Sequence, residues 1–366
     1  MTATPRDEEL MAQAIELAAT ADYHTSPNPM VGALVVRDGA VIGRGVHRKA
    51  GAEHAEVLAL REAGEGARGA DLYVTQEPCS HYGRTPPCTD AVIAAGVRRV
   101  FAGMRDPNPR VDGRGLQALR AAGITVVAGV LADRVRKLNE FFVKHVTTGL
   151  PFVTAKFAMS LDGRIATHSG ESKWITSEAA RAEVHRLRHA HDAILVGANT
   201  VFRDDPNLTT RLPKGGRSPL RVVVDSRLRV PLDARIFQQQ TGDVLIATSD
   251  RSRGERLREF EKAGVPVVVL PSEEGRVGLH DLLRQLGERD CISLLIEGGS
   301  SMHGSAFDQG LVDKVVAFIA PRIIGGIEAP AAVGGHGVDR LADAHALRDV
   351  EVRQLGPDIM VSGYMR

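Results

Sequence analysis

The chain has 366 residues, a formal net charge of +1, 25% charged residues and only 4% aromatic residues. A nearly neutral chain attracts nucleic acids and acidic membranes only weakly, and scarce aromatic residues offer few platforms for stacked bases. We therefore expect a small-molecule substrate, with neither nucleic acid nor membrane as a partner. Because a single hydrophobic core stops growing at about 250–300 residues, the length predicts two domains.

Cysteine use and hydropathy indicate a cellular compartment. The chain has three cysteines, and Cys79 and Cys88 lie close together behind prolines. This usage favours a reducing compartment and metal binding over a disulfide framework. The first residues are acidic and lack an apolar stretch, so we expect no secretory signal. No apolar run reaches the roughly 18 residues that a membrane span needs. The sequence therefore predicts a cytoplasmic protein.

The apolar pattern of the first half predicts a layered α/β domain over residues 1–147. Asp38-Gly39 separates two short apolar runs, which indicates a hairpin. After the hairpin, helices and strands alternate, as in a sheet whose strands are joined by crossover helices. We expect strands at 31–36, 41–45, 71–75, 97–102 and 124–128, and helices at 7–20, 55–63, 89–95, 115–122 and 135–146.

Residues 147–151 have the turn chemistry of a linker, and a second α/β pattern follows over residues 151–366. Strands are expected at 152–159, 193–196, 220–225, 243–248, 266–270, 293–297 and 314–319, and helices at 177–190, 255–263 and 279–286. The chain therefore reads as two successive α/β domains.

His54, Cys79 and Cys88 form the main candidate site of the first half. Together they offer three zinc ligands and leave the fourth tetrahedral position open, as in catalytic rather than structural zinc sites. Glu56 suits a general acid/base that moves protons between water and an amine leaving group. The sequence therefore predicts one zinc ion and a hydrolytic deamination.

The spacing also sets a geometric condition on this site. Residues two apart on a helix point to nearly opposite sides, so His54 and Glu56 can share one centre only if a helix begins at about this point. A helix start near the second cysteine would lower its thiol pKa toward the metal-binding thiolate. The alternative is an ordinary histidine with two small buried cysteines. Cys291, which enters a predicted strand, is expected in the core.

Residues 77–88 extend the zinc-deaminase signature, His-x-Glu followed by Pro-Cys-x-x-Cys, by holding eight residues between the cysteines. In this form they resemble the riboflavin-biosynthesis deaminases, as do residues 28–32 and 106–109. Gln76 departs from that family, in which leucine is usual. The resemblance implies a cytidine-deaminase-like three-layer α/β/α domain that acts on an aminopyrimidine. Asn28 and His81 are candidates for holding the ring or its phosphate tail; the alternatives are a turn asparagine and a loop histidine.

Polar motifs also follow the strands of the second half. Trp174, the only tryptophan, lies in a polar loop before a serine- or threonine-capped helix. The strand at 293–297 ends in Gly298-Gly299 and serines, and glycines let backbone amides approach a pyrophosphate. The alternatives are a core tryptophan and an ordinary turn, since this is not the Gly-x-Gly-x-x-Gly fingerprint.

Together these segments resemble the reductase half of the bifunctional riboflavin-biosynthesis proteins, and both halves together cover about residues 7–363 in the same order. The resemblance implies a dihydrofolate-reductase-like α/β fold and NADPH as the cofactor. The positions that would contact the nucleotide are Ala158, Trp174, Thr200, Asp204, Gly299, Ser300, Ser301, Met302, His303, Gly304 and Ser305. Those that would hold the phosphoribosyl substrate are Ser172, Arg188, Leu208, Arg211 and Glu297.

Chemistry supports some of these roles. The guanidinium groups of Arg188 and Arg211 match the geometry of a phosphate. Lys156 and Asp204 are candidates for polarising or protonating the ribose carbonyl as hydride arrives. Just past a predicted strand, Ser249 and Arg251 could meet the 2′-phosphate of NADPH, with an ordinary surface loop as the alternative.

The sequence therefore predicts a bifunctional enzyme of riboflavin biosynthesis. Residues 1–147 would deaminate 2,5-diamino-6-(5-phosphoribosylamino)pyrimidin-4-one, and residues 151–366 would reduce the ribosyl group with NADPH to give 5-amino-6-(5-phosphoribitylamino)uracil. One alternative is a base deaminase that acts on tRNA or single-stranded DNA, which the near-neutral charge disfavours. Another, from a non-enzymatic class, is a folded chain whose reductase half only acts as a scaffold or binds nucleotide. We expect a homo-oligomer.

Overall fold

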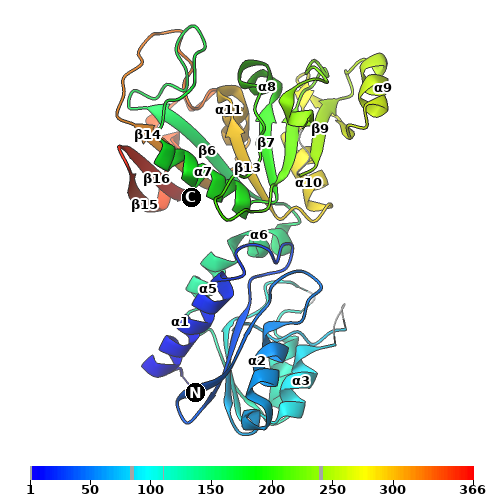
Figure 1. The fold of residues 1–366 in the computed structure, drawn as a ribbon, viewed down its shortest axis with the longest axis vertical. Coiled ribbons are helices and arrows are strands. Elements are labelled where there is room, and N and C mark those ends of the chain that lie inside the picture. The colour runs from blue at the N-terminus through cyan, green and yellow to red at the C-terminus, as the bar shows by residue number, and fades with distance from the viewer. Residues whose placement is uncertain (1, 83–85, 110, 239–241) are drawn as a thin grey trace. The chain divides into compact units, whose positions relative to one another are not determined.

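In the computed structural model, which describes residues 2–82, 86–109, 111–238 and 242–366, the chain divides into two units, Met1–Gly149 and Leu150–Arg366 (Figure 1). Each unit is built on a central sheet with helices on both faces. The predicted α/β class is therefore confirmed for both units.

The described part of the first unit has a sheet of five strands in the order β2-β1-β3-β4-β5. The first two pairings are antiparallel and the last two are parallel. The strands are β1 (Gly32–Arg37), β2 (Ala40–Val46), β3 (Asp71–Gln76), β4 (Arg99–Met104) and β5 (Thr125–Ala128). One face is covered by α2 (Ala55–Ala63), α3 (Cys88–Ala95) and α4 (Arg114–Ala121), the other by α1 (Pro5–Ala19) and α5 (Ala132–Leu138). The predicted three-layer arrangement is confirmed.

The single helix predicted at 135–146 is wrong, because α5 ends at Leu138 and a second helix, α6 (Glu140–Thr148), begins after Asn139. The buried Asn139 side chain accepts a hydrogen bond from the Met30 amide at 2.8 Å and donates one to the Met30 carbonyl at 3.0 Å. These bonds tie the helix break to the loop that carries Asn28. The apolar pattern runs through the break, so periodicity alone does not reveal it.

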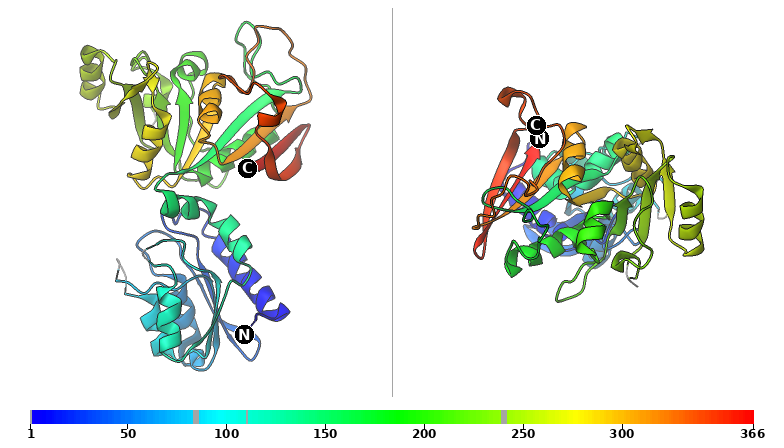
Figure 2. Two further views of the ribbon diagram at one scale, coloured as in Figure 1. Left: turned by 180° about the vertical axis from the view of Figure 1, so that it is seen from behind. Right: turned by 90° about the horizontal axis from the view of Figure 1, so that it is seen from above.

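The described part of the second unit contains a nine-stranded sheet in the order β10-β9-β8-β7-β13-β6-β14-β16-β15 (Figures 1 and 2). Neighbours are parallel from β10 to β14, and β16 and β15 add an antiparallel hairpin. The strands are β6 (Phe152–Ser160), β7 (Ala193–Gly197), β8 (Leu220–Val224), β9 (Val244–Ser249), β10 (Val267–Leu270), β13 (Ser293–Gly298), β14 (Lys314–Ala320), β15 (Leu347–Leu355) and β16 (Asp358–Met365).

Helices cover both faces of this sheet. α10 (Leu279–Gly287) and α11 (Ser300–Asp308) pack on one face, and α7 (Glu178–Ala190), α8 (Ala198–Asp204) and α9 (Gly254–Lys262) pack on the other. A small separate hairpin is formed by β11 (Ser272–Glu273) and β12 (Arg276–Val277). Short 3-10 helices lie at Gly64–Ala67, Arg235–Phe237 and Leu341–Asp343.

The sequence did not predict α8, α11, the small β11–β12 hairpin or the C-terminal β15–β16 hairpin. β15 is exposed along nearly its whole length and carries several charged side chains, so it lacks the alternation of a half-buried strand. α8 spans seven residues and α11 is rich in serine and glycine, which gives both helices a weak apolar pattern.

The loops after β6 and β14 lie side by side, and we call residues 161–176 and 321–346 the paired loops (Figures 1 and 2). Asp162 joins them, because its carboxylate accepts hydrogen bonds from the backbone amides of Ile324 at 3.0 Å and Gly325 at 2.7 Å. Arg164 adds a hydrogen bond to the Ala329 carbonyl at 2.6 Å. Parts of both loops line the cavity described below.

Candidate active sites

His54 directly precedes α2 and has an extended backbone, so the helix begins at Ala55. This start meets the predicted condition, because His54 lies outside the helix while Glu56 lies in its first turn. Gly45 of β2 permits the close approach of α2, since a Cβ atom there would lie 1.9 Å from the Ala55 carbonyl oxygen. Glu56 is only 3% exposed, and burial raises its pKa to about 7. Such a carboxyl group can both take up and release a proton near neutral pH.

Cys79 follows β3, and Cys88 is the first residue of α3. His54 Nδ1 lies 3.0 Å from Cys88 Sγ and 3.6 Å from Cys79 Sγ, and the three ligand atoms lie within 4.8 Å of one another. The structure thus brings the predicted ligands together. One imidazole nitrogen and two sulfurs suit zinc and leave a fourth position for water or substrate.

The surroundings of Cys79 favour its thiolate. The side-chain contact with Cys88 and the hydrogen bond from His54 lower the pKa of Cys79 to about 4 against the opposing effect of burial. The Cys88 backbone amide, at the start of α3, also donates to Cys79 Sγ at 3.3 Å. A thiolate is the form that binds metal, so the donor chemistry fits a zinc ion.

His47, at the end of β2, belongs to this site although the sequence did not single it out. It is 3% exposed, and its ring lies 5.4 Å from the His54 ring. Nδ1 lies 3.1 Å from the Glu53 carbonyl oxygen, which can only accept, so Nδ1 carries the proton. Nε2 must then accept from the Asn28 amide nitrogen at 3.2 Å. This bond fixes the orientation of the Asn28 amide beside the candidate metal site.

Two other sequence observations concern the rim of this site. Gln76 is buried and donates a hydrogen bond to Asp106 at 3.2 Å, so a polar partner accommodates the departure from leucine. His81 is exposed on the loop between the cysteines. Residues 83–85 of the predicted motif lie outside the described residues.

A buried ion cluster lies at the adjacent strands β6 and β13. Arg188 Nε and Nη2 donate to the two carboxylate oxygens of Glu297 at 2.7 and 2.8 Å, and Lys156 Nζ lies 3.8 Å from the same carboxylate. Burial opposes the charged form of Glu297, but Arg188 and Lys156 outweigh it and bring its pKa to about 2. Burial lowers the pKa of Lys156. The Glu297 carboxylate therefore balances the charge of two buried cations, Arg188 and Lys156.

The predicted phosphate-binding arginines differ in their surroundings. The third nitrogen of Arg188, Nη1, donates to the Thr209 carbonyl at 3.1 Å, so the protein itself engages every nitrogen of this guanidinium. Arg211 is exposed and has a single long side-chain hydrogen bond, to Thr209 Oγ1 at 3.4 Å, among the residues the structure describes. Arg211 is thus better placed than Arg188 to meet a phosphate. Leu208 is buried, with 4% exposure.

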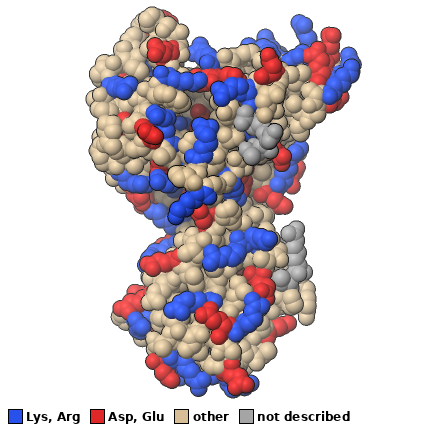
Figure 3. All heavy atoms as spheres, in the orientation of Figure 1, with Lys and Arg blue, Asp and Glu red and all other residues tan. Residues whose placement is uncertain are grey.

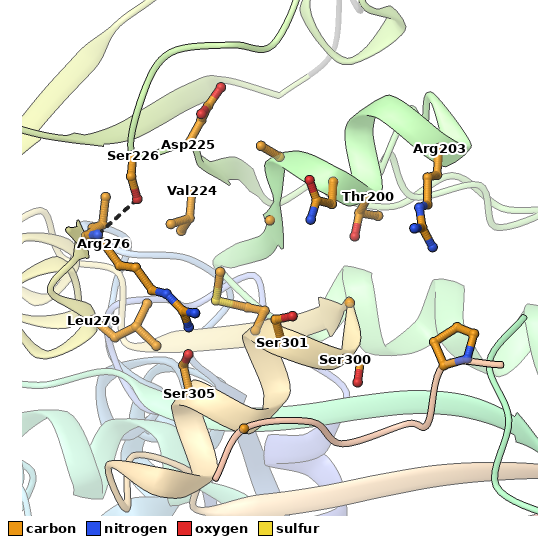
Figure 4. Close-up of a pocket in the computed structure, with 18 of the residues that line it drawn as sticks. Thr200, Arg203, Val224, Asp225, Ser226, Arg276, Leu279, Ser300, Ser301 and Ser305 are labelled. Carbon is orange, nitrogen blue, oxygen red and sulfur yellow. Dashed lines mark hydrogen bonds between the residues drawn. The ribbon is translucent and has the colours of Figure 1, made fainter. Parts of the chain in front are cut away.

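A cavity of about 1300 Å³ opens at the carboxyl ends of β7, β8 and β13 (Figure 4). Its volume exceeds that of a typical small-ligand pocket, so an extended ligand can enter it. Gly298 has a φ of +131°, which favours glycine, and α11 begins two residues later with amides suited to an anion. Several of the predicted nucleotide and substrate residues line the cavity: Ser172, Thr200, Asp204, Gly299, Ser300, Ser301, Met302 and Ser305.

Four predicted nucleotide contacts are not among the described residues that line this cavity. Ala158 packs in a core cluster, and Gly304 supports the tight contact of α11 with Gly334. Trp174 is 61% exposed and lies under the Arg181 guanidinium, 4.7 Å from its ring centre. His303 is 1% exposed.

The sequence also missed part of the cavity wall. The cavity is further lined by Ser226, Arg227, Arg251 and Arg276, from the ends of β8 and β9 and from the small hairpin. Only Arg251 was a sequence candidate. Positions directly after parallel strands are the signal that could have indicated Ser226 and Arg227.

Basic and acidic side chains intermingle on the face of each unit that Figure 3 shows, in keeping with the net charge of +1. Within the described part of the chain, no helix combines the length and apolar character that crossing a membrane requires.

Comparisons with known proteins show the family of this chain. Residues 151–361 match the RibD C-terminal domain family, and residues 4–104 match the zinc-binding region of cytidine and deoxycytidylate deaminases. The riboflavin biosynthesis protein RibD of Escherichia coli K12 is 44% identical over 366 residues, covering 97% of this chain and 98% of that protein. RibD of Actinobacillus pleuropneumoniae is 43% identical, covering 98% and 95%.

Solved structures give the same result. Acinetobacter baumannii RibD, form 1, is 40% identical with a TM-score of 0.89, and the alignment covers 99% of each chain. A Thermotoga maritima protein described as a diaminohydroxyphosphoribosylaminopyrimidine deaminase and 5-amino-6-(5-phosphoribosylamino)uracil reductase is 37% identical with a TM-score of 0.86 and the same coverage.

Proposed function

The chain belongs to the RibD family and is a bifunctional deaminase and reductase of riboflavin biosynthesis; from this premise we propose which residues and cofactors carry the two reactions. The two alternatives left open by the sequence, a deaminase of nucleic-acid bases and a non-enzymatic scaffold, are wrong for a member of this family. The homo-oligomer and the cytoplasmic location stay predictions.

We assign deamination of 2,5-diamino-6-(5-phosphoribosylamino)pyrimidin-4-one to the first unit. The observation that carries this assignment is the meeting of His54, Cys79 and Cys88 within 4.8 Å, at the helix start that buries Glu56. These three residues would hold one zinc ion, which when bound supplies the Lewis acidity that activates water toward the amine-bearing ring carbon.

In this proposal Glu56 carries the protons. Its carboxylate takes a proton from the attacking water and passes it to the ring amine, which leaves as ammonia. Asn28, oriented by His47, would hydrogen-bond the pyrimidine ring. His81, on the exposed loop, is the candidate for the phosphate tail.

We assign reduction of the ribosyl group to the second unit, with the large cavity as the NADPH site. When bound, NADPH supplies a hydride to the carbonyl carbon of the open-chain ribosyl group. The Lys156 ammonium donates a proton to the carbonyl oxygen, and Glu297 holds that ammonium in place. Asp204, which accepts a hydrogen bond from Ser172 at 2.8 Å, is the second candidate for proton donation. Arg211 would bind the substrate phosphate.

The test separates the two activities in one protein. Glu56→Gln keeps the size of the side chain but removes its titratable carboxyl group. We expect it to retain zinc and to abolish ammonia release, while NADPH oxidation with the deaminated intermediate continues. Glu53→Gln is the matched control, because the exposed Glu53 pairs with Arg61 at 2.8 Å and has no part in the proposed chemistry.

Mass spectrometry reports both steps, since deamination exchanges an amine for oxygen and reduction adds two hydrogens. Loss of both activities in Glu56→Gln would argue against two separate sites. Full deamination by that variant would argue against Glu56 as the proton carrier.

A further inference from the structure

One end of the large cavity combines several arginines with two acids of the small hairpin, Glu273 and Glu274. Arg227, Arg251 and Arg276 all line it near Ser226. In the part of the chain that the structure describes, none of these three guanidinium groups forms a hydrogen bond or an ion pair. Figure 4 shows Arg276 reaching into the cavity toward α11, at the opposite end from Arg203. Three unpaired cations at one end of a ligand cavity favour an anionic ligand group there.

A local hydrogen-bond network holds Arg276 at this place. The amide of Val277, its neighbour in β12, donates to Ser226 Oγ at 3.1 Å, which fastens the β11–β12 hairpin to the end of β8. Ser249 Oγ donates to the Ser226 carbonyl at 2.8 Å and is fully buried, so the sequence candidate Ser249 supports this network and does not face the cavity. Arg251 lies beside the same hairpin, because a Cβ atom on Gly275 would be 3.4 Å from its Nη1.

The acid at the end of β8 does not compete for the ligand. In many dinucleotide sites an acid after a strand binds the two hydroxyls of the adenosine ribose. Here the Asp225 carboxylate is 1% exposed, and it accepts hydrogen bonds from the amides of Val230 at 2.7 Å and Arg227 at 3.3 Å. It points away from the cavity (Figure 4). The backbone therefore engages the Asp225 carboxylate, and the other acids that line this end are Glu273 and Glu274 of the small hairpin.

The two ends of the cavity differ in a way that orients a dinucleotide. Ser172, a predicted substrate residue, donates a hydrogen bond to Asp204 at 2.8 Å, and both line the cavity. Asp204 directly follows Arg203 in α8, so both lie toward the Arg203 end. A nicotinamide ring must meet the substrate, so it belongs at that side. The adenosine then lies at the Ser226 end.

We propose that Arg276, with Arg251 beside it, binds the 2′-phosphate on the adenosine ribose of NADPH and makes the site select NADPH over NADH. This inference rests on the proposed function, in which the cavity holds NADPH. A guanidinium group offers two parallel hydrogen bonds to a phosphate, whereas the uncharged ribose hydroxyls of NADH give it little to bind. Arg276 is thus a specificity-determining residue supplied by a small hairpin outside the main sheet.

The test measures binding rather than turnover, by calorimetric titration of the full-length protein with NADPH and with NADH. Arg276→Ala should weaken NADPH binding by about tenfold or more, the usual effect of losing a charge-assisted hydrogen bond, and should change NADH binding by less than about twofold. The NADPH affinity of Arg276→Lys should lie between those of the wild type and Arg276→Ala, because lysine keeps the positive charge but cannot form the two parallel hydrogen bonds of a guanidinium group. Arg258→Ala, an exposed arginine on α9 outside the cavity, is the matched control and should bind both nucleotides like the wild type.

Adenosine 2′-monophosphate and adenosine 5′-monophosphate give a second measurement, in which only binding of the 2′-phosphate should depend on Arg276. Equal weakening of NADPH and NADH in Arg276→Ala would mean that Arg276 meets the pyrophosphate or only shapes the hairpin, and would overturn the inference. Unchanged NADPH affinity would overturn it as well. A wild-type protein that binds neither dinucleotide would instead refute the proposed cofactor, and this inference with it.

Discussion

Arg188 holds Glu297 through two parallel hydrogen bonds, Nε to Oε1 at 2.7 Å and Nη2 to Oε2 at 2.8 Å. Both side chains are largely buried, at 12% and 6% exposure, and Lys156 depends on the same carboxylate. Removal of Arg188 would leave Glu297 with one cation 3.8 Å away. The pair therefore fixes the charge and the position of the lysine that we assign to proton donation.

Arg188→Leu should destabilise the second unit by about 3–5 kcal/mol, the usual cost of breaking a buried ion pair from one side. Reductase activity should be lost, while zinc content and deamination remain. Chemical denaturation followed by both activity assays measures this. Arg186→Leu is the control, because Arg186 is 62% exposed and its loss should cost less than about 1 kcal/mol. Equal effects of the two substitutions would contradict a special role for the Arg188 pair.

Cys88→Ala should remove zinc and deaminase activity and leave the reductase working, because two remaining ligands hold zinc poorly. Metal analysis by mass spectrometry, expressed as zinc per chain, measures the loss. The matched control is Cys291→Ala, since Cys291 lies buried in the core of the other unit, where burial raises its thiol pKa to about 11. A Cys88→Ala protein that keeps one zinc per chain would show that the metal has other ligands.

Asp162→Ala should loosen the paired loops, because its carboxylate bonds two backbone amides of the second loop and one hydroxyl, that of Ser160 at 2.6 Å. These hydrogen bonds bring the pKa of Asp162 to about 2, so the carboxylate stays charged at neutral pH. Limited proteolysis should cut within residues 321–346 several times faster than in the wild type, and NADPH should slow the cut because Pro330, Gly335 and His336 line the cavity. Asp339→Ala, an exposed residue of the same loop, should leave the cleavage rate unchanged.

The candidate zinc site could be predicted from the sequence because its residues lie close together along the chain. His54, Glu56, Cys79 and Cys88 occur at short spacings, and the condition that a helix begin at His54 follows from the helical repeat. The role of His47 could not be predicted from such spacings. Its place beside His54 comes from the packing of α2 across β2, which Gly45 permits, and no spacing along the chain encodes that contact.

In the cavity of the second unit, too, the sequence predicts residues that follow a strand but not residues brought there by tertiary packing. The glycine and serine positions at 299–301 follow a strand and could be anticipated from the pattern. Arg276 could not be anticipated, because it lies on a two-residue strand whose position depends on tertiary contacts, namely the hydrogen bond of Val277 to Ser226 and the burial of the Val277 side chain in the core. Arg188 was predicted to hold the substrate from a family resemblance supported by its guanidinium chemistry, and neither indicated its hydrogen bonds to Glu297, which lies 109 positions later in the chain.

Two buried histidines make the second unit sensitive to acid. Burial lowers the pKa of His191 and of His303 from 6.5 to about 4, and for His303 the nearby Lys156 charge adds to the effect. His303 is 1% exposed, and neither ring nitrogen has a hydrogen-bond partner of good geometry among the described residues. Between pH 6.5 and about 4 the unfolded chain binds more protons than the folded one, so stability must fall as the pH is lowered through this range.

His303→Leu should remove the contribution of His303 to the loss of stability at low pH. The free energy of unfolding of the wild type should fall by up to about 1.4 kcal/mol per pH unit for each such histidine within that range, and the variant should lose stability less steeply. Denaturant titrations between pH 7.5 and about 4.5 measure both slopes, with the exposed His280→Leu as the matched control. A His303→Leu slope equal to that of the wild type would mean that His303 is already protonated in the folded protein, because a group with the same charge in both states contributes nothing to the slope.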